Sequence, residues 1–169
     1  VNNFKKKLPI IYIFEPKVGR QIARNTGIKN AKYDAIAFID DDCIADKNWI
    51  HNLSCIHKKN PDILIIQGKM NNKLKNKFLS EAFQYILNNC KPTPFDTKNL
   101  SFKRKLLDNL KYIFDKRFKF CEDIELGIRL RQKVYEVLYS PNITVYHNHK
   151  TDFISLAKQQ FNSGRGAFL

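Results

Sequence analysis

Long apolar runs are missing from this sequence, and no stretch of it is long enough to span a bilayer. The four cysteines form no CxxC pair and their spacing fits no zinc pattern, which excludes the common zinc modules and indicates free thiols in a reducing compartment. Internal repeats and low-complexity linkers are absent as well. No helix-turn-helix, RNP-like or zinc signature of a nucleic-acid-binding domain is present.

Acidic residues are scarce: 16 of them face 30 lysines and arginines, for a net charge of +14. Such a surplus favours anionic partners, namely nucleic acid, nucleotide phosphates or an anionic membrane surface. The sequence is also rich in Lys, Asn and Ile together, as AT-rich coding sequence tends to be, so charge alone argues weakly for nucleic acid. With 169 residues and 43% hydrophobic content, the chain is long and apolar enough for one globular domain.

Strand-like and helix-like segments alternate along the chain. We expect strands at 10–14, 35–39, 63–67, 100–102, 134–139 and 143–147, and helices at 20–30, 46–56, 78–87, 103–110, 122–132 and 153–162. This alternation predicts an α/β domain whose mixed, mostly parallel sheet is flanked by helices. The chain begins at Val1 without a Met start or a signal-peptide pattern, so we expect a single domain, 1–169, cut at its N-terminus from a longer protein.

Three adjacent carboxylates, Asp40, Asp41 and Asp42, follow the apolar run at 35–39. A buried strand that ends in acids delivers charge to the carboxyl edge of the sheet, where open α/β sheets bind ligands. Adjacent carboxylates repel one another unless a cation relieves them, and their hard oxygens suit Mg²⁺ or Mn²⁺. The competing interpretation is a solvated acidic turn; the preceding buried strand and the basic chain favour the metal.

Two further clusters carry chemically useful side chains. Glu122 and Asp123 begin the predicted helix at 122–132, where the helix N-terminus favours ionised carboxylates that can act as a base or hold a cation. Ordinary first-turn capping by acids explains them equally well. His147 ends the last predicted strand, and a neutral imidazole there is either a metal ligand or simply a structural residue.

The order of these clusters is more specific than any one of them. The stretch 19–49, with GRQIARNTGIKNA, AIAFIDDDC and then Trp49, resembles the centre of the family 2 glycosyltransferases of the GT-A fold. The segment EDIEL with Arg129-Leu130, followed by YSP at 139–141 and VYH at 145–147, resembles the second half of that family. The family normally opens with a further strand, turn and second strand that hold the nucleotide base, and these are absent here.

The resemblance implies a donor site. Asp40 and Asp42 match the ends of the family's DxD motif, so Asp42 would ligate a Mn²⁺ or Mg²⁺ ion that bridges the diphosphate of the sugar nucleotide. Asp40 is expected as a further metal ligand, or against the ribose or a metal-bound water, and Asp41 would face the sugar. His147 matches a position at which some members carry a metal-ligating histidine.

The resemblance also implies an acceptor side. Asp123 matches the catalytic base of inverting members, and Glu122 would support it or the acceptor. Arg24 and Asn25 match a segment that lies beside the nucleotide and sugar. Arg165 belongs to a basic stretch that would reach the diphosphate as a lid. Cys121 stands where many members carry Gly.

The leading hypothesis is a metal-dependent, inverting glycosyltransferase that moves a sugar from a UDP-, GDP- or dTDP-sugar to a hydroxyl of a saccharide, lipid-linked or protein acceptor. Cell-envelope polysaccharide synthesis is the usual setting, in the cytoplasm or at the inner face of the membrane. Alternatives are a catalytically incompetent fragment with a binding role and a basic nucleic-acid-binding module. A metal-dependent nucleotidyltransferase also uses strand-end carboxylates, but the segment EDIELGIRL tells against it.

Overall fold

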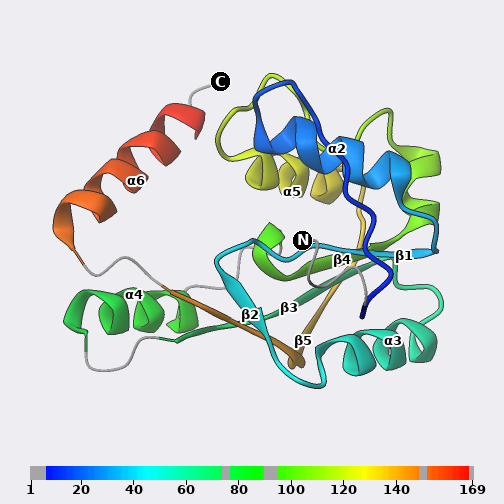
Figure 1. The fold of residues 1–169 in the computed structure, drawn as a ribbon, viewed down its shortest axis with the longest axis horizontal. Helices are drawn as coiled ribbons and strands as arrows, with labels where there is room; N and C mark the ends of the chain where they lie inside the picture. Colours follow the sequence, from blue (N-terminus) through cyan, green and yellow to red (C-terminus); the bar gives the residue numbers. More distant parts are fainter. Residues whose placement is uncertain (1–6, 74–76, 90–94, 149–151, 168–169) are drawn as a thin grey trace.

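The computed structural model describes residues 7–73, 77–89, 95–148 and 152–167. A five-stranded sheet in the order β1-β4-β3-β5-β2 forms its centre (Figure 1). The strands are β1 (Ala35–Ala37), β2 (Cys43–Ala45), β3 (Ile65–Asn72), β4 (Leu100–Lys103) and β5 (Val137–His147). The helices are α2 (Arg20–Asn30), α3 (Trp49–Lys59), α4 (Phe78–Asn89), α5 (Glu122–Gln132) and α6 (Phe153–Ala167), with 3-10 turns η1 (Thr97–Asn99) and η2 (Arg104–Asn109).

The sheet is mixed and flanked by helices, as expected, but the prediction that it is mostly parallel is wrong. In the described sheet β3 and β5 form a parallel pair, whereas β1 with β4, β3 with β4 and β2 with β5 are antiparallel. The reason is the direction in which the chain re-enters the sheet. β4 begins opposite Gln67 and runs towards Ile65, in the direction opposite to β3. A parallel pair would need a connection that crosses to the other end of the sheet.

The two faces of the sheet are covered by different helices. Ile65 packs with Ile28 of α2 and with Leu126 and Leu130 of α5 in the larger core, and the neighbouring Ile66 packs with Leu53 of α3 in the smaller one. Successive side chains of a strand point to opposite faces, so α2 and α5 cover one face and α3 covers the other (Figure 1). Among the helices of the described residues, none is long and apolar enough to cross a membrane.

Helix predictions were accurate where an apolar stripe meets a buried face. The helices predicted at 20–30 and 122–132 are found with these bounds, and α6 extends five residues beyond the predicted end at 162. The helix predicted from Asp46 begins at Trp49 with Asn48 as its N-cap, and Asp46 instead accepts a hydrogen bond from the backbone N of Asn48. The segment predicted as a helix at 103–110 is the 3-10 turn η2.

Several strand predictions need correction. Residues 10–14 form no strand, and their large apolar side chains are exposed, because no described strand pairs with this segment. The strand predicted at 35–39 ends at Ala37, and the expectation that it is buried is wrong: only Ile36 of the three residues is buried, because β1 lies at the edge of the sheet and pairs with β4 alone. The two strands predicted on either side of Pro141 are one strand, β5, whose register with β3 shifts between Gly68 and Lys69. Such an irregularity accommodates a proline that cannot donate to the ladder.

Candidate active site

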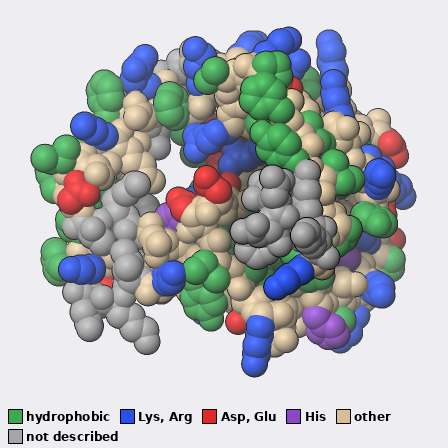
Figure 2. All heavy atoms as spheres, viewed as in Figure 1, with side chains coloured by type: hydrophobic (Ala, Val, Ile, Leu, Met, Phe, Trp, Pro, Cys, Tyr) green, Lys and Arg blue, Asp and Glu red, His purple; other side chains and the backbone are tan. Residues whose placement is uncertain are grey.

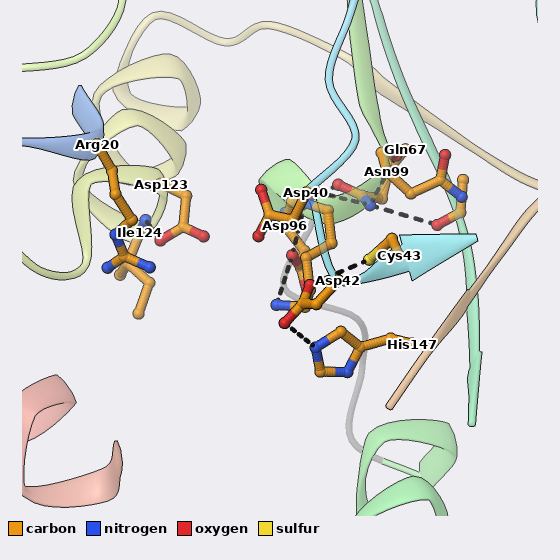
Figure 3. A network of polar contacts seen from close by, with 12 residues as sticks. Arg20, Asp40, Asp42, Cys43, Gln67, Asp96, Asn99, Asp123, Ile124 and His147 are labelled. Carbon is orange, nitrogen blue, oxygen red and sulfur yellow. Dashed lines mark hydrogen bonds and ion pairs between the residues drawn. The ribbon is translucent and has the colours of Figure 1, made fainter. Parts of the chain in front are cut away.

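Acidic side chains lie on both sides of a hollow in the molecule. Asp40, Asp42 and His147 lie at one side, by the edge of β2, and Asp123 lies at the other, at the first turn of α5, with its carboxylate directed across the gap (Figure 3). The space-filling view shows this hollow with acidic and basic side chains on its rim (Figure 2). Strand-end residues and the N-terminus of a helix therefore converge on one place.

Asp42 and His147 are brought together by strand pairing. Cys43, the residue after Asp42, is the partner of His147 in the antiparallel pair of β2 and β5. As a result the Nε2 atom of His147 lies 3.2 Å from Oδ2 of Asp42. A carboxylate oxygen beside an imidazole nitrogen is a donor set that suits Mn²⁺, and the exposed Asp42 leaves the pair open to the hollow.

Cys43 does not compete with this pair as a thiolate. Burial, followed by the charges of Asp42 and Asp40, raises the pKa of the Cys43 thiol to about 12. Its Sγ atom lies 3.7 Å from Oδ1 of Asp42, where the protonated thiol can donate a weak hydrogen bond. Cys43 therefore fills space beside the carboxylate, as a neutral residue at neutral pH.

Asp40 points to a different partner. One nitrogen of the Arg24 guanidinium donates to Oδ1 of Asp40 at 3.0 Å, and the other donates to Oε1 of Glu122. Arg24 thus joins the acidic loop to the start of α5, and its guanidinium lies 5.6 Å from the centre of the Phe114 ring. Within the described residues, no three acids, histidines or cysteines are grouped closely enough to enclose a metal ion, so Asp40 does not complete a three-residue site with Asp42 and His147.

Glu122 connects the start of α5 to α2 through ion pairs. Its side chain is 3% exposed, and it forms ion pairs with Arg24 and, at 3.5 Å, with Arg20. Two arginines balance the charge of this buried carboxylate. Glu122 therefore fixes the start of α5 against α2, and its predicted support of catalysis stays a prediction.

Asp123 is a carboxylate whose surroundings shift its pKa. Burial raises the pKa of the Asp123 carboxyl, and the neighbouring charges of Asp96 and Glu122 raise it further, while Lys98 and the backbone N–H of Ile124 oppose the shift. Asp123 lines a cavity of about 340 Å³ together with Asp96, Lys98 and two amides of α6, Gln159 and Asn162. A carboxylate with a raised pKa at the wall of a cavity is a functional-site candidate on physical grounds.

Asp96 and Lys98 were missed at the level of sequence. Both belong to a segment predicted as a loop, part of which, 90–94, lies outside the described residues. Oδ1 of Asp96 accepts from the backbone N of Lys98 at 3.0 Å and lies 2.9 Å from the Lys98 ammonium. An Asp followed two residues later by Lys is common in any turn, so only the tertiary structure places this pair beside Asp123.

Of the three other predicted site residues, one is hydrogen-bonded to a neighbouring loop and two are exposed. Asn25 makes two hydrogen bonds with the backbone of Phe114, at 2.7 and 3.1 Å, so its amide holds the loop that precedes α5. Asp41 is exposed in the turn between Asp40 and Asp42. Arg165 is exposed in the last turn of α6.

The model of one protein family, described as glycosyl transferase family 2, matches residues 1–118. The chain belongs to glycosyl transferase family 2. A curated relative of this family 2 chain is the chondroitin synthase of Pasteurella multocida (strain Pm70), which is 25% identical over 152 residues, covering 79% of this chain and 16% of that protein.

Solved structures share the fold of this family 2 chain. Staphylococcus aureus TarS has a TM-score of 0.64 at 16% identity, over 88% of this chain and 28% of TarS. Glucosyl-3-phosphoglycerate synthase from Mycobacterium tuberculosis, in complex with Mn²⁺, UDP-glucose and phosphoglyceric acid, has a TM-score of 0.60 at 15% identity, over 91% of this chain and 55% of that chain. The mixed sheet with its flanking helices is therefore the GT-A glycosyltransferase fold. The chain spans about a sixth of the chondroitin synthase and about a quarter of TarS.

Proposed function

We propose that the chain carries the central catalytic region of a metal-dependent, inverting glycosyltransferase that moves a sugar from a nucleotide sugar to an acceptor hydroxyl. One observation carries the proposal: the Asp42–His147 pair, with its atoms 3.2 Å apart, faces the Asp123 carboxylate across the hollow. A transferase of this kind needs a cation site for the leaving diphosphate and a separate base for the attacking hydroxyl. Membership of glycosyl transferase family 2 supports the same reaction class.

Asp42 and His147 would hold the divalent ion, and Mn²⁺ or Mg²⁺ fits their oxygen and nitrogen donors. When bound, the ion neutralises the charge that develops on the nucleoside diphosphate as it leaves. Asp40 is held by the guanidinium of Arg24 and would lie against the ribose of the donor or a metal-bound water. Glucosyl-3-phosphoglycerate synthase was crystallised with Mn²⁺ and UDP-glucose, and also with Mg²⁺ and UDP, which supports this choice of ions and of UDP as a first donor to test. Asp41, Asn25 and Arg165 stay predicted contacts of the donor.

Asp123 would accept the proton of the acceptor hydroxyl while the oxygen of that hydroxyl forms a bond to the anomeric carbon and the bond to the diphosphate breaks. One displacement of this kind inverts the anomeric centre. Because Arg24 ties Glu122 to Asp40, the start of α5 is fixed relative to the acidic loop, and the base keeps its place opposite the donor. Arg20 adds a second ion pair to Glu122.

The cavity beside Asp123 supports a saccharide as the acceptor. Its walls combine carboxylates and amides, which bond hydroxyl groups, with the rings of Phe95 and Phe120, which can contact the apolar face of a sugar. Its lining carries three acids, Asp96, Glu122 and Asp123, and two cations, Arg20 and Lys98, so the charges nearly balance and suit a neutral saccharide. Synthesis of a cell-envelope polysaccharide is the proposed setting.

Calorimetric titration tests the donor site directly. The chain is titrated with UDP, GDP and dTDP, with and without Mn²⁺, and each titration is repeated with Asp42→Asn. Binding of one nucleotide that requires Mn²⁺ and is lost in Asp42→Asn is the expected result. Absence of binding to all three nucleotides would overturn the proposal that this chain forms a working donor site, and would favour a non-catalytic binding role.

The net charge of +14 motivates a second test, for nucleic acid. A nucleic-acid-binding protein would bind duplex DNA or RNA with an affinity that falls linearly with salt on a log–log plot, by nearly one unit of slope per phosphate contacted. The acids that line the hollow lead us to expect only weak binding that disappears near physiological salt. Tight binding at that salt, with a steep slope, would favour the nucleic-acid alternative.

A further inference from the structure

Asp123 lies among other acids, which is an unfavourable place for a carboxylate that must be ionised in order to act as a base. Asp96 faces it from the turn before η1, and Glu122 precedes it on α5. Like charges this close, together with burial, favour the protonated form of a carboxyl group. A carboxylate accepts a proton only in its ionised form, so a cation in the same cavity would favour the proposed reaction.

The two arginines near Asp123 already form ion pairs with other carboxylates. Arg24 bonds both Glu122 and Asp40, and Arg20 pairs with Glu122 while lying 5.9 Å from the centre of the Phe120 ring. These contacts neutralise Glu122 and leave Asp96 and Asp123 to another cation. Lys98 is that cation within the described part of the cavity wall: its ammonium lies 2.9 Å from Oδ1 of Asp96 and lines the same cavity as Asp123.

The position of Lys98 is set by a buried network beneath it. The side chain of Gln67 accepts from the backbone N of Asp96 at 2.9 Å and donates to the backbone O of Asn99 at 3.1 Å. The Asn99 amide, 2% exposed as a residue, donates to the backbone oxygens of Lys69 and Ile143 and accepts from the Trp49 indole at 2.9 Å. The turn that carries Lys98 is thus bonded to β3, β5 and α3, so its side chain starts from a fixed backbone.

The charges around Lys98 agree with this geometry. Burial alone would lower the pKa of the Lys98 ammonium, but the carboxylates of Asp96, Asp123 and Asp40 outweigh burial and raise it. Lys98 therefore stays charged at neutral pH. In the described cavity wall the other charged or titratable groups are Asp96 from the η1 turn, Glu122 from α5, Arg20 from α2 and Cys121, whose thiol pKa is raised by burial. Helix α6 presents the neutral Gln159 and Asn162.

We propose that Lys98 is the positioning residue of Asp123: its ammonium holds the Asp96 carboxylate in the η1 turn and so sets the charge that Asp123 meets in the cavity they share. This role rests on the proposed function of Asp123 as a base, but its electrostatic part does not require transfer to occur. Lys98 does not touch the reacting atoms in this proposal; it acts through Asp123.

Carbon-13 NMR of the aspartate carboxyl groups tests the role in the full chain. Asp123→Asn identifies the Asp123 resonance, and its titration is then compared in the parent chain, Lys98→Met and Lys98→Arg. We expect the midpoint of the Asp123 titration to move to higher pH in Lys98→Met and to stay near the parent value in Lys98→Arg. Lys58→Met removes an exposed lysine of α3 and is the matched control, with an unchanged midpoint.

A second variant keeps the test decisive if Lys98→Met fails to fold. Asp96→Asn removes the opposing carboxylate and should move the Asp123 midpoint to lower pH. If Lys98→Met folds and the midpoint of its Asp123 titration is unchanged, the proposal is overturned. If Lys98→Met does not fold, an unchanged Asp123 midpoint in Asp96→Asn overturns it. Where transfer is measurable, the acid limb of its pH profile should move with the midpoint. A shifted midpoint in a chain without transfer activity would support the role of Lys98 and count against the proposed function alone.

Discussion

The Nε2 atom of His147 lies 3.2 Å from Oδ2 of Asp42, although 105 residues separate them along the chain. The antiparallel pairing of β2 with β5 sets this approach, since Cys43 is the direct partner of His147. Their side chains differ in exposure, 14% for His147 and 56% for Asp42. As the proposed metal ligands, His147 would be fixed by packing and Asp42 would be able to adjust to an ion.

Removal of either member of this pair should abolish nucleotide binding that depends on Mn²⁺. Asp42→Asn and His147→Ala each delete a donor, and the loss of metal affinity should exceed the roughly 10- to 100-fold that changes in second-shell partners cause. Titration calorimetry with Mn²⁺ and the bound nucleotide measures it. Asp62→Asn, in the exposed turn after α3, is the matched control and should bind as the parent chain does. Full affinity in both site variants would contradict the ligand assignment.

Asp123→Asn should separate binding from transfer. The amide has nearly the shape of the carboxylate but accepts no proton, so nucleotide binding should persist while the transfer rate falls by about 10²- to 10⁴-fold, the usual contribution of a general base. Sugar transfer to the acceptor is measured beside Asp108→Asn, an exposed aspartate of η2. Transfer by Asp123→Asn at the parent rate would show that Asp123 is not the base.

The same substitution should stabilise the fold at neutral pH. Burial raises the pKa of Asp123 above its ordinary value of 3.8, followed by the charges of Asp96 and Glu122. Between 3.8 and the raised pKa the folded chain holds a proton that the unfolded chain has lost, so stability falls as pH rises through this window. Urea unfolding of both chains should show a gain for Asp123→Asn at pH 7 that shrinks as the pH falls below the raised pKa. A gain that is independent of pH would count against an electrostatic origin.

Gly68→Ala should disturb the network beneath Lys98. A Cβ at Gly68 would lie 2.6 Å from the backbone O of Ile143 and would also collide with the side-chain amide of Asn99. Backbone cannot move aside cheaply, so unfolding in urea should show a loss of about 1–3 kcal/mol, the usual cost of overpacking. Gly27→Ala is the opposite control: a Cβ there meets nothing within 4 Å in the middle of α2, and alanine should stabilise by about 0.4–1 kcal/mol. Equal stability of the two variants would contradict the packing argument.

Local patterns predicted the elements best where a side of each element is buried by its neighbours. The apolar spacing of 122–132 and the acids at its start identify α5 with its observed bounds. The apolar residues at 10–14 are just as strand-like, yet they form no strand, because a strand needs a partner and none of the described strands supplies one. Ile50 and Ile128 fit a helical stripe but are exposed, since spacing identifies a face without stating what covers it.

The amino-acid sequence by itself determined the class of fold and predicted the residue types of the candidate site: an acidic loop after an apolar strand, an acidic helix start and a histidine at the end of a strand. Only the tertiary structure decided which of these residues contact one another. It pairs Asp42 with His147, commits Asp40 and Glu122 to Arg24, and sets Lys98 beside Asp96 and Asp123. Ion pairs and strand register join residues far apart in the chain, and no local pattern encodes which distant charge a carboxylate will meet.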